Sequence, residues 1–160
     1  MMKYIAVVAL LVLCPLAFAQ SGDGYVFFAP GQARGAGESL FAMHYGGGVR
    51  YIAKNGVGLG AEIGMAGPKD NFADTFIGVF SPNGYYVFKT SNEKVQPFVT
   101  GGYTRTFGHG SGHNWGNFGA GVTYWAAAKT GMLIEFRDHI MRDHGTTAQV
   151  WGIRLGLAFK

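Results

Sequence analysis

The sequence predicts an all-β fold: an eight-stranded antiparallel up-and-down transmembrane β-barrel, preceded by a cleavable signal peptide. In the segment 150–159 every second residue is large and apolar: Trp151, Ile153, Leu155, Leu157 and Phe159. The residues between them are two glycines, one alanine and Arg154. Strand side chains point to opposite faces in turn, so this segment has an apolar face and a small or charged face, which suits a narrow barrel in lipid.

Two further observations support the barrel. The same period of two recurs in segment after segment along the chain. The composition includes 27 glycines and 24 aromatic residues (13 Phe, 8 Tyr and 3 Trp), a bias that does not favour a helical domain.

The N-terminal residues have the pattern of a secretory signal peptide. Lys3 precedes an apolar run over residues 5–13, and Ala17-Phe18-Ala19 forms a small-residue cleavage site before Gln20. The run is too short to cross a bilayer as a helix. We therefore expect a signal peptide over residues 1–19 and an outer-membrane β-barrel domain over residues 20–160. The only cysteine, Cys14, lies within the predicted signal, so the barrel would fold without disulfides.

Charge sets limits on the partners. Removal of the signal takes away only Lys3, so the net charge falls from +4 to +3. A charge this mild does not indicate nucleic-acid binding. We also expect no cofactor.

The segments 41–51 and 57–65 are predicted to form a hairpin. In the second of them, apolar residues alternate with Gly58, Gly60, Glu62 and Gly64. In the first, Arg50 and His44 occupy the same face as the glycines. The inner faces agree only if the connecting loop holds an odd number of residues, and the three residues 54–56, with Gly56 in the left-handed conformation, satisfy this condition.

Six further strands complete the expected barrel. The segments 115–125, 132–139 and 150–159 alternate clearly, whereas 25–29, 75–88 and 95–107 are less regular. Pro97 lies near the start of its strand. Pro82 lies inside one, where the missing N–H requires a bulge or a weakened rung of the ladder.

The connections are predicted to alternate in length. The longer ones cover 31–39, 67–74, 108–114 and 141–148, whereas 54–56 and 127–130 are tight and 89–94 is intermediate. Both termini then lie on the side of the shorter turns. This is the layout of an outer-membrane barrel with periplasmic ends, and the barrel must be closed because lipid cannot satisfy an open edge.

The chain resembles the small eight-stranded outer-membrane β-barrels of the OmpA/OmpX-like superfamily, also described as the porin-like outer-membrane β-barrel domain. The segments that carry the resemblance are GVGLGAEIG, VQPFVTGGY, NFGAGVTYW, EFRDH and the terminal strand ending in Phe159. The resemblance implies that Phe159 acts as an assembly signal for the barrel-insertion machinery. In the family this aromatic residue is usually the last, whereas Lys160 follows it here.

Charged residues are predicted to gather on the inner face: Arg50, Glu62, Glu135, Arg137 and Arg154. Arg50 and Glu62 are one diagonal step apart on neighbouring strands, and Arg154 lies across the last hairpin from Glu135 and Arg137. Buried charges are tolerated when paired and hydrogen-bonded, so we expect a linked network. Either the network fills and rigidifies the lumen, or it is also a gate whose salt bridges rearrange to open a narrow water path.

Four histidines raise the question of catalysis. His109, His113, His139 and His144 fall near the loop end, with Ser111, Asp138 and Asp143 nearby. Some eight-stranded barrels are lipid A deacylases or palmitoyl transferases that use His with Ser at that rim. The deacylase pattern needs a serine two residues after the histidine, and His139 is followed there by Met141. A metal site would need a third ligand beside His109 and His113. We expect solvated loop histidines, no metal and no enzyme.

A soluble lipocalin-like barrel that binds a greasy ligand is the main alternative to an inserted barrel. It would need the apolar face inside, which would leave an outer surface of glycine with hardly any charge. Aromatic residues near the strand ends instead predict two interfacial girdles. We expect a monomeric envelope protein of the Gram-negative outer membrane that contacts lipid and lipopolysaccharide and permits at most weak, gated permeation of small solutes.

Overall fold

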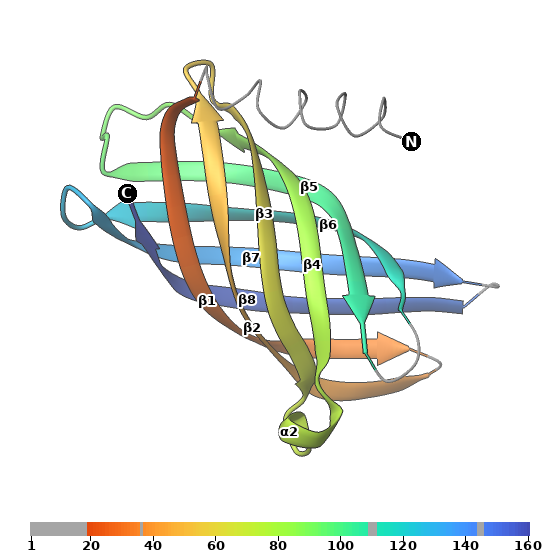
Figure 1. The fold of residues 1–160 in the computed structure, drawn as a ribbon. Helices are drawn as coiled ribbons and strands as arrows, with labels where there is room; N and C mark the ends of the chain where they lie inside the picture. The colour runs from red at the N-terminus through yellow and green to blue at the C-terminus, as the bar shows by residue number, and fades with distance from the viewer. Residues whose placement is uncertain (1–18, 36, 109–111, 144–145) are drawn as a thin grey trace, which may run out of the picture.

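The protein is a closed barrel of eight antiparallel strands (Figure 1). The computed structural model describes residues 19–35, 37–108, 112–143 and 146–160, so most of the predicted signal peptide lies outside the described residues. The strands are β1 (Ala19–Gly35), β2 (Glu38–Ala53), β3 (Val57–Pro68), β4 (Ile77–Val87), β5 (Val95–Phe107), β6 (Asn114–Trp125), β7 (Thr130–Asp143) and β8 (Thr146–Phe159). Each strand pairs with the next, and β8 pairs with β1 to close the sheet. The predicted fold class is confirmed.

The first predicted hairpin turn is also confirmed. Residues 54–56 connect β2 to β3, and Gly56 has a φ of 89°. Its N–H donates to the carbonyl oxygen of Ala53 at 2.9 Å. Glycine is favoured here because a side chain strains a backbone with positive φ.

Two of the four predicted long connections are confirmed, since residues 69–76 separate β3 from β4 and residues 108–113 separate β5 from β6. The other two predicted long connections are wrong. Only residues 36–37 separate β1 from β2, and only 144–145 separate β7 from β8, because the strands continue well beyond the expected ends. The backbone groups of 31–35 and 141–143 find ladder partners across their hairpins instead of facing water. The connection 88–94 between β4 and β5 is longer than either. The short helix α2 (Phe72–Thr75) lies between β3 and β4.

The two ends of the barrel are named here by their connections. The loop end holds the connections after β1, β3, β5 and β7, and the turn end holds those after β2, β4 and β6. Ala19 pairs with Ala53 and Phe159 with Thr130, so both ends of the described chain lie at the turn end. At the loop end, β1 and β8 remain paired as far as Arg34 and Gln149.

Pro82 produces the weakened rung that its position predicts. The β4–β5 ladder pairs Phe80 with Arg105 and then Asn83 with Gly102, and omits the two residues between. The register is unchanged across the gap, so the missing N–H interrupts the ladder without inserting a bulge.

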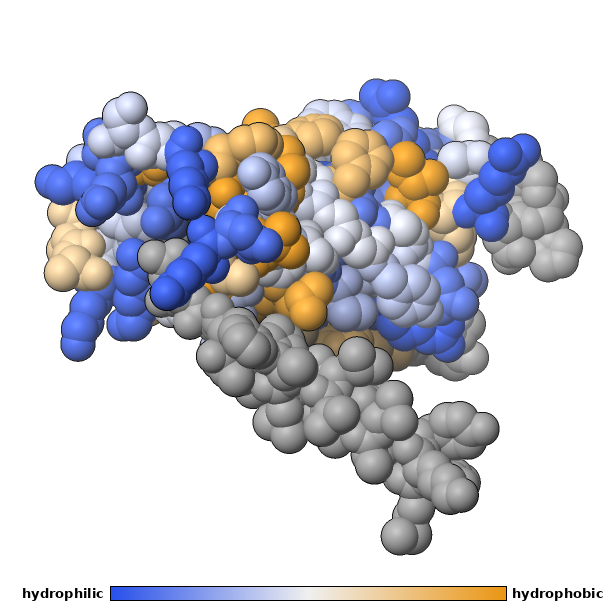
Figure 2. All heavy atoms as spheres, turned by 90° about the horizontal axis from the view of Figure 1, so that it is seen from above, coloured by the Kyte–Doolittle hydropathy of each residue, from blue (hydrophilic) through white to orange (hydrophobic). Residues whose placement is uncertain are grey.

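The apolar face lies outside. Ile153, Leu155 and Leu157 are each about half exposed, whereas Arg154 between them is 1% exposed. Figure 2 shows apolar residues across the middle of one wall and hydrophilic residues toward both ends. This distribution is the reverse of what a lipocalin-like barrel requires. Among the described residues, no helix is long and apolar enough to cross a membrane.

Candidate functional site

The structure places the five predicted charged residues inside the barrel. None has more than 3% of its surface exposed: Arg50, Glu62, Glu135, Arg137 and Arg154. They come from β2, β3, β7 and β8, and they face inward because each occupies the parity of its strand that is opposite to the lipid-facing side chains.

Glu62 is the centre of the network. Its Oε1 accepts hydrogen bonds from Arg154 Nη1 at 2.8 Å and Arg137 Nη2 at 3.1 Å. The hydroxyls of Tyr25 and Tyr85 donate to the same oxygen at 2.6 and 3.3 Å. Glu62 is on β3, whereas Arg137 is on β7 and Arg154 is on β8. The two arginine bonds therefore cross the lumen from one wall to the opposite wall.

Glu135 completes the charge balance. It lies directly opposite Arg154 in the β7–β8 register, with 3.6 Å between Oε2 and Arg154 Nη1. On its own strand it accepts a hydrogen bond from Arg137 Nε at 2.6 Å. Arg137 Nη1 also donates to Asn117 Oδ1 at 2.9 Å. Two arginines and two glutamates therefore form a neutral cluster, the arrangement in which buried charge is tolerated.

The expected pairing of Arg50 with Glu62 is wrong. Arg50 binds Asp23 with two hydrogen bonds, from Nε to Oδ1 at 2.8 Å and from Nη2 to Oδ2 at 3.1 Å. Asp23 is directly opposite Arg50 in the β1–β2 register, whereas Glu62 is only diagonal to it, and a direct neighbour allows the two-pronged geometry. Asp23 was not predicted, because its strand was expected to begin at Tyr25; the parity that Asp23 shares with Tyr25 was the available signal.

Aromatic residues fill the lumen around the network and on its turn side. Five of them point inward and are buried: Tyr25, Phe27, Tyr85, Phe98 and Trp125. The guanidinium of Arg50 lies over the rings of Tyr25, Tyr85 and Phe98, 5.1–5.7 Å from their centroids. Sequence alternation does not predict this layer, because β1 carries aromatic residues on both faces.

Glycines on neighbouring strands make room for these rings. A Cβ on Gly48 would lie 2.8 Å from the Tyr25 hydroxyl, and one on Gly46 would lie 2.8 Å from the Phe27 ring. The same holds for Gly60 beside Tyr85, at 2.9 Å, and for Gly121 beside Phe98, at 2.8 Å. At each of these glycines a Cβ would also lie 2.5–2.8 Å from a backbone carbonyl oxygen of a neighbouring strand. Contacts under 3.0 Å require something to shift, so each inward glycine leaves room both for a ring on another strand and for a neighbouring backbone.

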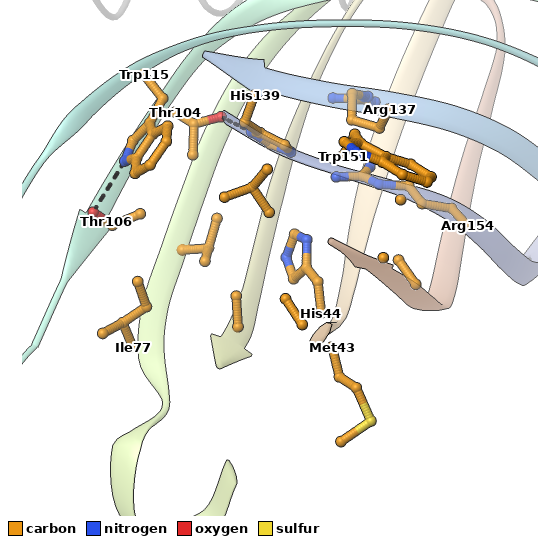
Figure 3. Close-up of a pocket in the computed structure, with 17 residues that line it drawn as sticks. Met43, His44, Ile77, Thr104, Thr106, Trp115, Arg137, His139, Trp151 and Arg154 are labelled. Carbon is orange, nitrogen blue, oxygen red and sulfur yellow. Dashed lines mark hydrogen bonds between the residues drawn. The ribbon is translucent and has the colours of Figure 1, made fainter. Parts of the chain in front are cut away.

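The loop-end half of the lumen holds a cavity of about 80 Å³. Figure 3 shows the rings of His44 and His139 and the guanidinium of Arg154 directed toward it. His139 is 8% exposed, and its Nδ1 lies 3.2 Å from Thr104 Oγ1. The prediction of a solvated loop position for His139 is therefore wrong, because β7 continues to Asp143 and keeps position 139 within the barrel.

Among the other predicted loop residues, those that the structure describes do not form a catalytic group. His113 is exposed, and His109, Ser111 and His144 lie outside the described residues. Asp138 accepts a hydrogen bond from Gln149 Nε2 at 2.7 Å, whereas the hydrogen-bond partner of the His139 ring is Thr104. Within the described part of the chain, no three His, Cys, Asp or Glu side chains lie close enough to hold a metal ion.

Comparisons with known proteins identify the fold. Neither protein-family models nor curated sequences gave a match. Among solved structures, the chain is similar to Neisserial surface protein A, with a TM-score of 0.74, 13% identity and coverage of 89% of this chain and 98% of that one.

Two further barrels resemble the chain. The N-terminal β-barrel domain of Pseudomonas aeruginosa OprF gives a TM-score of 0.64 at 19% identity, covering 88% of this chain and 98% of that one. The attachment invasion locus protein Ail of Yersinia pestis, solved with the heparin analogue sucrose octasulfate, gives 0.54 at 14% identity, covering 86% and 97%. The chain therefore has the fold of the eight-stranded outer-membrane barrels.

Proposed function

We propose that this protein is an integral, non-enzymatic β-barrel of a Gram-negative outer membrane, with both termini periplasmic. Its role is structural, and its salt-bridged lumen permits weak, gated permeation of small solutes. The observation that carries the proposal is the division of the barrel wall: large apolar side chains face outward while paired charges are buried within.

Aromatic side chains at both ends of the barrel support insertion in a bilayer. At the turn end, five of them are outward and exposed: Tyr51, Tyr86, Phe88, Tyr124 and Phe159. At the loop end, the outward, exposed rings include Phe41, Phe76, Tyr103 and Phe107. Such rings favour the interface between acyl chains and headgroups, and two belts of them fit lipid and lipopolysaccharide as the surrounding partners.

The same wall supports the assembly route. Phe159 is 44% exposed on the outer face at the turn end, where the barrel-insertion machinery would recognise it. The closed sheet leaves no strand edge for pairing with a second copy, which supports a monomer.

The gate is supported by the distribution of hydrogen bonds around Glu62. Four donors converge on Oε1, while Oε2 has no partner among the described residues. Glu135 offers both arginines a second acceptor, so the cross-lumen bonds can exchange for bonds along the β7–β8 wall. The aromatic layer on the turn side remains a second barrier, and for this reason the expected permeation is weak.

Two measurements test the proposal. For the location, we expect heat-modifiable gel migration and recovery in the detergent-soluble outer-membrane fraction, and release by osmotic shock would contradict insertion. For the gate, single-channel recording of refolded protein should give brief, small openings. Removal of charge by Glu62→Gln or Arg154→Gln should lengthen or enlarge them. The matched control is Glu93→Gln, in an exposed turn. Silence of every variant would overturn the permeation and leave the structural role.

A further inference from the structure

The cavity in the loop-end half of the lumen has an uneven charge distribution. Both arginines of the central network, Arg137 and Arg154, line it, whereas neither Glu62 nor Glu135 does. The network is neutral as a whole, but its carboxylates lie behind the guanidinium groups as seen from the cavity. The cavity is therefore exposed to the positive side of the network.

Arg154 has a donor to spare. Its Nη1 is bound to the two glutamates, but its Nη2 is buried and has no hydrogen-bond partner among the described residues. Arg137, by contrast, donates from Nε, Nη1 and Nη2. An unpaired buried N–H costs the desolvation of that group, so Nη2 needs an acceptor from outside the described chain.

Two imidazoles lie near this donor. The rings of His44 and His139 both line the cavity, and their centroids are 6.2 Å apart. The His44 ring packs edge-on against Phe27, with 5.0 Å between centroids, which holds its orientation. A neutral imidazole has one N–H, so the histidines supply further donors to an acceptor at Arg154.

The remaining wall is mostly apolar and made mostly of small residues, with Thr104 and Thr106 as its hydroxyl groups. It includes Ala29, Ala42, Ala66, Ile77, Val79 and Val150. Apolar walls with a few convergent polar groups are typical of small-molecule sites. At roughly 10–15 Å³ for each water-sized position, the cavity of about 80 Å³ holds about six such positions, enough for a ligand with about six heavy atoms.

We propose that this cavity is a binding site for a small aliphatic monocarboxylate. The carboxylate accepts hydrogen bonds from Arg154 Nη2 and from an imidazole N–H, and the short chain packs against the alanine and valine wall. A metal ion does not fit, because it would face two guanidinium groups. The site requires only the folded barrel and is independent of whether the lumen conducts.

Butyrate titrated into the refolded full-length barrel tests the proposal, with the imidazole NMR signals of His44 and His139 as the readout. Butyramide, which has the same shape without the charge, is the matched probe. We expect saturable shifts with butyrate and at least about tenfold weaker binding of butyramide, since hydrogen bonds to charged groups are the stronger ones.

Two leucine substitutions separate binding in the cavity from binding elsewhere. Ala66→Leu fills the cavity without altering a charge, and we expect it to weaken butyrate binding at least about tenfold. Ala61→Leu makes the same change on the same strand, at a position of opposite parity that does not line the cavity, and should bind as the parent does. Equal binding of butyrate and butyramide would overturn the proposal, as would parent-like binding by Ala66→Leu or the absence of saturable shifts.

Discussion

Replacement of Glu62 by glutamine tests whether the central network stabilises the barrel. The substitution keeps an acceptor for the hydroxyls of Tyr25 and Tyr85 but removes the charge that Arg137 and Arg154 share. Glu135 is then the only carboxylate in contact with either guanidinium among the described residues.

The magnitude follows from the burial of these groups. Removal of one partner from a buried ion pair costs about 3–5 kcal/mol, because the other charge is left uncompensated. Glutamine retains part of the hydrogen bonding, so we expect a loss of about 3 kcal/mol in the free energy of unfolding. Urea titration of the barrel refolded in lipid vesicles, followed by tryptophan fluorescence, measures this loss. Glu93→Gln removes the same charge from an exposed turn and should stay within about 0.5 kcal/mol of the parent.

A compensating substitution distinguishes charge imbalance from lost contacts. Glu62→Gln combined with Arg154→Gln removes one charge of each sign. Since the two residues are in direct contact, we expect the double variant to be more stable than the sum of the single losses predicts, by about 1 kcal/mol or more. A Glu62→Gln barrel within about 0.5 kcal/mol of the parent, or strictly additive losses, would refute the view that the network acts as a unit.

Three further substitutions test other parts of the barrel. Leu155→Arg places a charge at an outward, mid-strand position and should cost about 2–4 kcal/mol in vesicles, and unchanged urea stability would contradict the outward assignment. Gly156→Leu brings a Cβ against the backbone carbonyl of the neighbouring strand and should cost about 1–3 kcal/mol. Gly84→Leu is the control, because a Cβ there would be 3.7 Å from the nearest atom, and it should not carry this cost. Refolding yields on gels will show the difference between the two variants. Asp23→Asn leaves Arg50 buried without its charged partner and should cost about 3–5 kcal/mol in the same urea assay, and a neutral result would argue against the two-pronged pair.

The sequence predicted most of the fold because its period of two identifies the faces of each strand. Parity alone required an odd turn between β2 and β3, and the three residues with Gly56 at positive φ are what the structure has. Strand ends were less predictable. In β1 the residues Tyr25, Val26, Phe27 and Phe28 are apolar on both faces, so no alternation indicated that the strand extends in both directions.

Side-chain partners were predictable only as far as the register limits them. Arg50 has two carboxylates within reach, Asp23 and Glu62. It pairs with Asp23 because β1 begins before that residue, and the alternation did not indicate where β1 begins. The depth of His139 likewise depends on the length of β7. The cavity depends on a balance of side-chain volumes from β1 to β8, which no local pattern contains.

The fit between inward glycines and rings on other strands has an evolutionary consequence. A larger residue at Gly48 requires a smaller residue at Tyr25 as well as a shift of the Ala61 carbonyl oxygen, which a Cβ would approach to 2.7 Å. A smaller residue at Tyr25 leaves a hole that Gly48 cannot fill. Divergence inside the barrel should therefore proceed by paired exchanges. Alignments of this chain with its relatives should show the two positions varying together, while the lipid-facing positions drift one at a time.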